Sequence, residues 1–215
     1  MITKTRRPIT RAAYDWQDAA VCRQTDSDLF FSDAYRDQDT ARKMCVGCPA
    51  LLECLTTTLG DERKMPSGYR FGIAGGLRAD QRRALHWETV LHGGPDIDQA
   101  AELSHGRSGF RFAEVWRSCG SLEAVADRLA QDGTVVDLST VRLAVWWQGG
   151  RSPRVAPRGP SDPTEGARLA RDYADVLYEL SGRGAPRADM AAYLGVSLEP
   201  VVLAMRRLNN RRAAA

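Results

Sequence analysis

Apolar residues recur at intervals of three and four along much of this chain, and no segment keeps the period of two that a half-buried strand needs. Near the C-terminus, a series of this kind predicts a single amphipathic helix that ends before Ser181 and Gly182. Its apolar face comprises Leu169, Tyr173, Val176, Leu177 and Leu180. The pattern as a whole predicts an all-α fold.

After that helix, the sequence resembles a helix-turn-helix unit. Residues 189–194 form a short predicted helix, Gly195 permits a turn with positive φ, and Ser197 is a good N-cap for a helix over residues 198–209. Four arginines lie at the far end of that second helix: Arg206, Arg207, Arg211 and Arg212. This arrangement favours DNA binding, and the alternative is a small helical bundle whose arginines are simply solvated.

The middle of the chain repeats this shape. Residues 112–117 read as a helix, Ser121 as the cap of a second helix and Ser139 as the cap of a third. Residues 86–150 hold five basic and nine acidic side chains, which weakens a direct DNA role because phosphate contacts need positive charge. A role in packing or protein contact is the alternative, and Cys119 reads as a small buried apolar residue.

Two stretches without helical period divide the chain, one near residues 92–96 and one at residues 151–163, which contain four prolines. The predicted segments are a basic arm (1–13), a first domain (14–86), a middle module (104–150), a linker (151–163) and a basic C-terminal module (164–212). Net charge is +3, but the arm has four basic and no acidic residues, and residues 151–215 have eleven against seven. Contacts with DNA are therefore expected at the two ends.

The N-terminus has no continuous apolar core of a signal peptide, and no later stretch approaches the roughly 18 apolar residues of a membrane span. We therefore expect a cytoplasmic protein without a membrane partner. In a reducing compartment, five cysteines indicate metal or redox chemistry rather than a disulfide framework.

Four of the cysteines fall within one short window as Cys22, Cys45, Cys48 and Cys54. Four thiolates suffice for one tetrahedral zinc site or one cubane iron-sulfur cluster, and the spacing alone leaves both open. A third alternative is a thiol-disulfide switch without metal, although thioredoxin-like redox sites need a βαβ setting that is not predicted here.

The residues around these cysteines form four motifs in order: Asp15 and Trp16 before Cys22, then DSDLFF, CVGCPALLEC, and GIAGGLRADQRRAL at residues 72–85. This series resembles the WhiB-like regulators of actinobacteria and their phages. The resemblance covers residues 14–86, about a third of the chain.

The resemblance implies a small helical domain around a [4Fe-4S] cluster that reacts with oxygen or nitric oxide and docks on the primary sigma factor of RNA polymerase. It makes Cys22, Cys45, Cys48 and Cys54 the cluster ligands. The implied sigma-factor contacts are Trp16 and a glycine-rich turn containing Gly72, Ile73, Gly75 and Gly76, with Phe30 and Phe31 either contacting the partner or shielding the cluster. The implied DNA contacts after the turn are Arg78, Arg82 and Arg83.

The chain departs from the family at one position of that turn, because GIAGG stands where GVWGG is typical and Ala74 replaces the aromatic residue. Truncation of a buried aromatic anchor commonly costs about 2 kcal/mol or more of binding free energy. Sigma-factor binding is therefore expected to be weaker or altered.

These features together predict a redox- or nitric-oxide-responsive transcription regulator with no catalytic turnover and no small-molecule substrate. Another class is an interaction protein that sequesters the sigma factor or polymerase without binding DNA, its four cysteines holding a structural zinc. A third is a thiol-disulfide oxidoreductase that works through Cys45 and Cys48, which lacks a recognisable scaffold.

Overall fold

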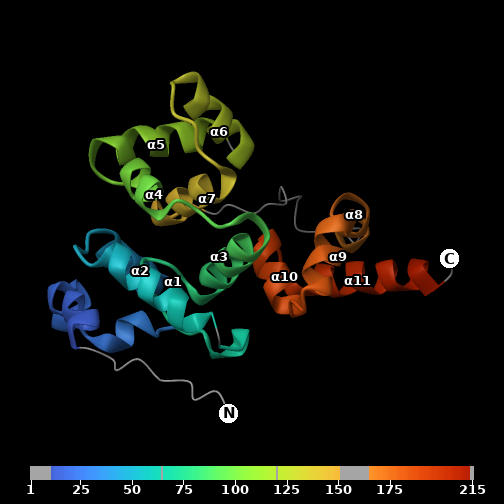
Figure 1. Cartoon of the computed structure of the whole chain (residues 1–215), viewed down its shortest axis with the longest axis horizontal. Coiled ribbons are helices and arrows are strands. Elements are labelled where there is room, and N and C mark those ends of the chain that lie inside the picture. The colour runs from blue at the N-terminus through green and yellow to red at the C-terminus, as the bar shows by residue number, and fades with distance from the viewer. Residues whose placement is uncertain (1–10, 64, 120, 151–164, 214–215) are drawn as a thin grey trace, which may run out of the picture.

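The computed structural model describes residues 11–63, 65–119, 121–150 and 165–213, and within these residues every regular element is a helix (Figure 1). The only strand-like pairing among them is an isolated bridge between Ala74 and Leu77. The predicted all-α fold is confirmed. The linker, and all of the basic arm except residues 11–13, lie outside the described residues.

Short 3-10 helices precede the first α-helix and another precedes the third. Their bounds are η1 (Arg11–Ala19), η2 (Val21–Gln24), η3 (Ser27–Phe30) and η4 (Ser67–Tyr69). The first α-helices are α1 (Tyr35–Val46), α2 (Leu51–Glu62), α3 (Ala79–His92) and α4 (Ile97–Ser104). They are followed by α5 (Gly106–Cys119), α6 (Leu122–Gln131) and α7 (Leu138–Trp147). The C-terminal helices are α8 (Glu165–Asp172), α9 (Ala174–Gly182), α10 (Arg187–Leu194) and α11 (Leu198–Ala213).

A hydrophobic core joins the first domain to the middle module. Leu51 and Leu55 of α2 and Leu85 of α3 belong to the same buried cluster as Phe112 of α5 and Trp147 of α7. Burial of this apolar surface stabilises the arrangement by roughly 25 cal/mol per Å². Residues on both sides of positions 86–104 belong to this core. The predicted boundary between the first domain and the middle module stays a prediction.

The last helix of the middle module, α7, is almost entirely buried. Nine of its ten residues, Ser139 to Trp147, are buried, whereas a DNA-reading helix must present one face to solvent. The helix packs against α4 and α6 and reaches α3. Of the two roles predicted for the middle module, its geometry fits packing.

A second core holds the C-terminal module against the other side of α3 (Figure 1). Trp87 is buried among residues of α8 to α11, and its indole Nε1 donates a hydrogen bond to Asp189 Oδ2 of α10 at 3.0 Å. His92 Nε2 lies 3.1 Å from the Tyr193 hydroxyl. Helix α3 therefore carries one core on each side.

Two local predictions were wrong. The series from Leu169 to Leu180 does not form one helix, because α8 ends at Asp172 and α9 begins at Ala174, with Tyr173 between them outside both helices. Helix α7 is capped by Asp137 rather than by Ser139: the Asp137 carboxylate accepts the backbone N–H of Thr140 at 3.0 Å.

Other local predictions are confirmed. Ser121 caps α6 by accepting the N–H of Ala124, and Gly195 ends α10 at φ 72° before α11 begins. Among the described residues no single helix meets the length and apolarity of a membrane span, and α10 with α11 does so only as a pair bent by 113°.

A buried ion pair between α7 and α3 generates the first prediction. Arg142 Nη1 lies 2.8 Å from Glu88 Oε1, its Nη2 donates to Tyr193 O at 2.8 Å, and both charged side chains are at most 2% exposed. Arg142→Met removes one buried charge of this pair and the hydrogen bonds it donates, which should lower the free energy of unfolding by about 3–5 kcal/mol in urea denaturation. Arg183→Met removes an exposed pair with Glu179 and should cost less than about 1 kcal/mol. Equal losses in the two variants would contradict the structural role of the buried pair.

Candidate iron-sulfur cluster site

A two-residue hairpin turn lies at the centre of the candidate site. Ala74 N donates to Leu77 O at 3.1 Å and Leu77 N donates to Ala74 O at 3.0 Å, which closes a turn through Gly75 and Gly76. Both glycines have positive φ, 55° and 71°, as a type I′ turn requires. Residues with a side chain rarely adopt this backbone, so the sequence needs two consecutive glycines here.

Space also requires glycine at both positions. A Cβ on Gly75 would lie 2.6 Å from Leu55 Cβ, and a Cβ on Gly76 would lie 3.0 Å from ring atoms of Trp147. The Trp147 indole Nε1 donates to Gly75 O at 2.9 Å, and this side chain is only 1% exposed. The turn is therefore held between α2 and the end of α7.

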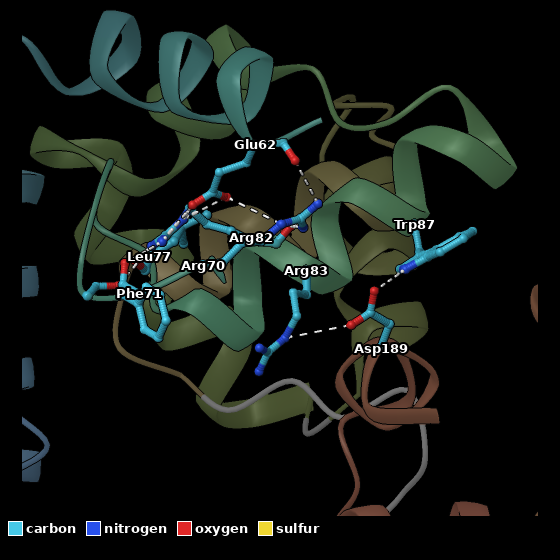
Figure 2. A network of polar contacts seen from close by, with 9 residues as sticks. Glu62, Arg70, Phe71, Leu77, Arg82, Arg83, Trp87 and Asp189 are labelled. Carbon is cyan, nitrogen blue, oxygen red and sulfur yellow. Dashed lines mark hydrogen bonds and ion pairs between the residues drawn. The ribbon is translucent and has the colours of Figure 1, made fainter. Parts of the chain in front are cut away.

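Arg82 of α3 holds the two arms of the hairpin together (Figure 2). Its Nη1 donates to Gly72 O at 2.9 Å and to Leu77 O at 2.7 Å, and its Nη2 donates to Phe71 O at 2.7 Å. The Glu62 carboxylate pairs with the same guanidinium at 2.9 Å. Arg82 is 1% exposed, so the expected DNA contact of this residue is wrong: its donors face backbone carbonyls and a buried carboxylate.

Arg78 and Arg83, the two neighbouring arginines, differ in how far they are exposed to solvent. Arg78 is half-buried and pairs with Asp80 at the start of α3, with 3.1 Å between Nε and Oδ1. Arg83 reaches towards Asp189 of the C-terminal module, with 3.9 Å between Nε and Oδ1 (Figure 2). DNA contacts by these two residues stay predictions, and Arg78 is the more exposed of the pair.

The structure brings the four predicted ligand cysteines together around one cavity of about 250 Å³. Cys22 comes from η2, Cys45 from the last turn of α1, Cys48 from the loop between α1 and α2, and Cys54 from the first turn of α2. All four thiols are free, and Gly75 lines the same cavity.

The cavity and its donors fit a multi-atom group. A volume of about 250 Å³ equals that of several water molecules at about 30 Å³ each. A tetrahedral zinc site would draw the same four sulfurs to about 2.3 Å from one point, whereas a cubane cluster occupies the space between them. Four thiols around such a volume match the ligand set of a cubane cluster.

The turn donates its N–H groups towards two of the sulfurs. Burial raises the pKa of the Cys45 thiol to about 12, and the backbone N–H of Gly76 opposes this rise by hydrogen bonding to the sulfur. Burial likewise raises the pKa of Cys54, against which the N–H of Gly75 acts. These N–H groups stabilise negative charge on the sulfurs, as a metal-bound thiolate requires.

The aromatic residues expected at the site divide into buried and exposed ones. Phe30 is 8% exposed and lines the cavity together with the half-buried Trp16. Phe31 is 67% exposed and lies against Gly72, where its Cδ1 would be 2.9 Å from an added Cβ. Phe30 is therefore placed to shield the cavity, and Phe31 is available to a partner.

The glycine turn itself is less accessible than the resemblance implies. Ile73 is 8% exposed and donates its N–H to Phe30 O at 2.8 Å, while Gly75 and Gly76 are buried. Leu55 of α2 and Trp147 lie against Gly75 and Gly76, and Ile73 packs in a cluster with Phe30 and Ala41, so the predicted partner contact of these three residues stays a prediction that their burial disfavours. The contact of Trp147 with the turn was not predicted, because the two lie 72 residues apart in the sequence.

The predicted DNA-contacting arginines of the C-terminal module lie on the last half of α11. Arg206, Arg207, Arg211 and Arg212 are all exposed. The Arg212 guanidinium carbon lies 5.4 Å from the centroid of the Tyr178 ring, which supports the position of that side chain. The structure thus presents a basic helix end to solvent.

The hairpin generates the second prediction. Gly75→Ala places a methyl group against Leu55 at positive φ, so we expect a loss of about 2–4 kcal/mol in unfolding free energy, from overpacking and left-handed strain together. Gly60→Ala in α2 is the matched control, because nothing lies within 4 Å of the added Cβ. It should be neutral or stabilising by up to about 1 kcal/mol. Equal stability of the two variants in urea denaturation would show that the turn tolerates a side chain.

Comparison with known proteins places these features in a family. The family model described as transcription factor WhiB matches residues 16–85. The chain is 40% identical over 79 residues to transcriptional regulator WhiB2 of Mycobacterium tuberculosis, covering 36% of this chain and 82% of the relative. It is 39% identical over 70 residues to transcriptional regulator WhiB of Streptomyces coelicolor, covering 33% and 74%.

No solved structure matches the chain. The sequence matches, by contrast, extend over more than two thirds of both relatives, and the residues matched by the family model include the four cysteines and the glycine turn. The chain belongs to the WhiB family of transcription regulators.

Proposed function

We propose that this protein regulates transcription through a [4Fe-4S] cluster held by Cys22, Cys45, Cys48 and Cys54, and that it acts in the bacterial cytoplasm. The observation that carries the proposal is that these four thiols line one cavity, which Gly75 of the turn also lines. When bound, the cluster supplies a centre that reacts with oxygen or nitric oxide. The protein itself turns over no substrate.

The side chains around the cavity have separate roles in this proposal. Phe30 and Trp16 keep water from the cavity, and the N–H groups of Gly75 and Gly76 stabilise negative charge on the sulfurs. Cys22 lies on the exposed helix η2, so a small oxidant reaches the site from that side.

The C-terminal module is proposed to contact DNA. Helices α10 and α11, joined through Gly195, have the arrangement of a helix-turn-helix, and exposed arginines follow on α11. Positive charge on an exposed helix end supplies phosphate contacts. Helix α7 of the middle module is buried, so DNA binding is assigned to the C-terminal module.

The primary sigma factor of RNA polymerase is the proposed protein partner. The exposed Phe31, with Phe71 at 64% exposure, offers an aromatic surface beside the hairpin. Ala74 stands where the family has tryptophan, so the contact should depend more on Phe31 and be weaker than with an intact aromatic anchor.

The third prediction concerns the metal content. Protein purified without oxygen should contain about four irons and four sulfides per chain, and Cys48→Ser should lose them, since a cubane needs all four thiolates. Cys119→Ser, outside the cavity, should retain the cluster. One zinc per chain and no visible colour would instead support the interaction protein with a structural metal site.

The fourth prediction concerns DNA. The triple variant Arg206→Ala, Arg207→Ala, Arg211→Ala should weaken binding of duplex DNA uniformly across sequences and reduce the slope of log K against log salt by about 2–3, roughly one per phosphate contact. Arg183→Ala removes an exposed arginine of the same module that is paired with Glu179, and should leave the slope nearly unchanged. An unchanged affinity of the triple variant would exclude the end of α11 from the DNA interface.

A further inference from the structure

Trp147 lies well beyond the residues that match the family, yet it contacts the hairpin of the cluster site. The family match ends at residue 85, and the Trp147 indole donates to Gly75 O across 72 residues of sequence. Its ring atoms lie where a side chain on Gly76 would be. The extension therefore reaches the wall of the cluster cavity.

One peptide group connects this tryptophan to a ligand sulfur. The carbonyl of Gly75 and the N–H of Gly76 belong to the same peptide unit. The carbonyl accepts the indole N–H at 2.9 Å, Gly75 lines the cavity together with Cys45, and the Gly76 N–H acts to lower the pKa of the Cys45 thiol. Hydrogen bonds in such a chain polarise one another, so the indole strengthens the donor that faces Cys45.

Further contacts fix Trp147 on the helices that carry the cysteines. Arg42 Nη1 of α1 donates to Trp147 O at 2.8 Å, and the His105 ring packs edge-on against the indole with 5.7 Å between centroids. His105 Nε2 lies 2.9 Å from the carbonyl oxygen of Val46, the residue after Cys45. The extension thus holds the chain on both sides of this ligand.

We propose that Trp147 is a positioning residue of the cluster site: it fixes the peptide between Gly75 and Gly76 at the wall of the cavity that Cys45 also lines, and so the extension tunes the cluster. This inference rests on the proposed [4Fe-4S] cluster. Hydrogen bonds to cluster sulfurs stabilise the more negative, reduced form. Loss of the indole N–H should therefore lower the reduction potential and loosen the wall of the cavity.

The test compares two neighbouring tryptophans in the full chain. Trp147→Phe keeps a ring against Gly76 and removes the N–H donor. Trp146→Phe is the matched control, because Trp146 is on the same helix and 4% exposed, but packs on Arg142 at 4.8 Å instead of on the hairpin. With iron and sulfide content confirmed, we expect a lower midpoint potential and several-fold faster loss of the cluster's visible absorption in air only for Trp147→Phe.

A merely structural role for Trp147 predicts a different result. If both variants change the potential and the cluster lifetime equally, or if neither does, the positioning role is wrong. If Trp147→Phe fails to fold, a tryptophan analogue with sulfur in place of the indole N–H, incorporated at position 147, keeps the shape and removes the donor alone. An unchanged potential with that analogue would also overturn the proposal.

A second measurement separates this inference from the proposed function. In metal-free full-length protein, a thiol reagent should label Cys45 faster in Trp147→Phe than in wild type, while the exposed Cys22 serves as an internal reference. Wild-type protein without iron would refute the cluster but leave this comparison valid. Equal labelling of Cys45 in wild type and variant would refute the Trp147 contact even if the cluster is present.

Discussion

The arrangement of the whole site depends on a turn in which two consecutive residues have positive φ in a space too small for any side chain. Gly75 lies against Leu55, and Gly76 lies against Trp147. With the backbone fixed in this form, the N–H groups of the turn face two thiols while one of its carbonyls faces the indole. A residue with a side chain at either position would move both sides of the turn at once, so cluster ligation and packing of the extension share one constraint.

Buried charge supports the same region. Glu62 and Arg82 hold the arms of the hairpin, and Glu88 and Arg142 join α3 to α7. Isolated buried charges are costly, and each arginine is further stabilised by hydrogen bonds to backbone carbonyls: Arg82 donates to Gly72 O, and Arg142 donates to Tyr193 O. Both pairs include a residue of α3, which also separates the two hydrophobic cores.

The sequence predicts those features whose causes are local. The spacing of the cysteines, the cap at Ser121 and the glycine after α10 each depend on a few neighbouring residues, and these predictions agree with the fold. The burial of Arg82 and the contact of Trp147 with Gly75 depend on tertiary packing. The sequence pattern of an arginine after a turn is the same whether its side chain contacts DNA or a backbone carbonyl. The break at Tyr173 was missed for a related reason, since the apolar spacing continues through it.

The core that crosses from α2 and α3 into α4 to α7 has a consequence for the solubility of shorter forms of this protein. A chain that ended after α3 would lack Phe112, Trp147 and the other residues of α4 to α7 that share this core with Leu51 and Leu85. Exposed apolar surfaces promote association and aggregation unless another protein covers them. The first third of the chain, although it carries the family's cysteines and turn, therefore shares its core with the C-terminal extension and should be less soluble without it.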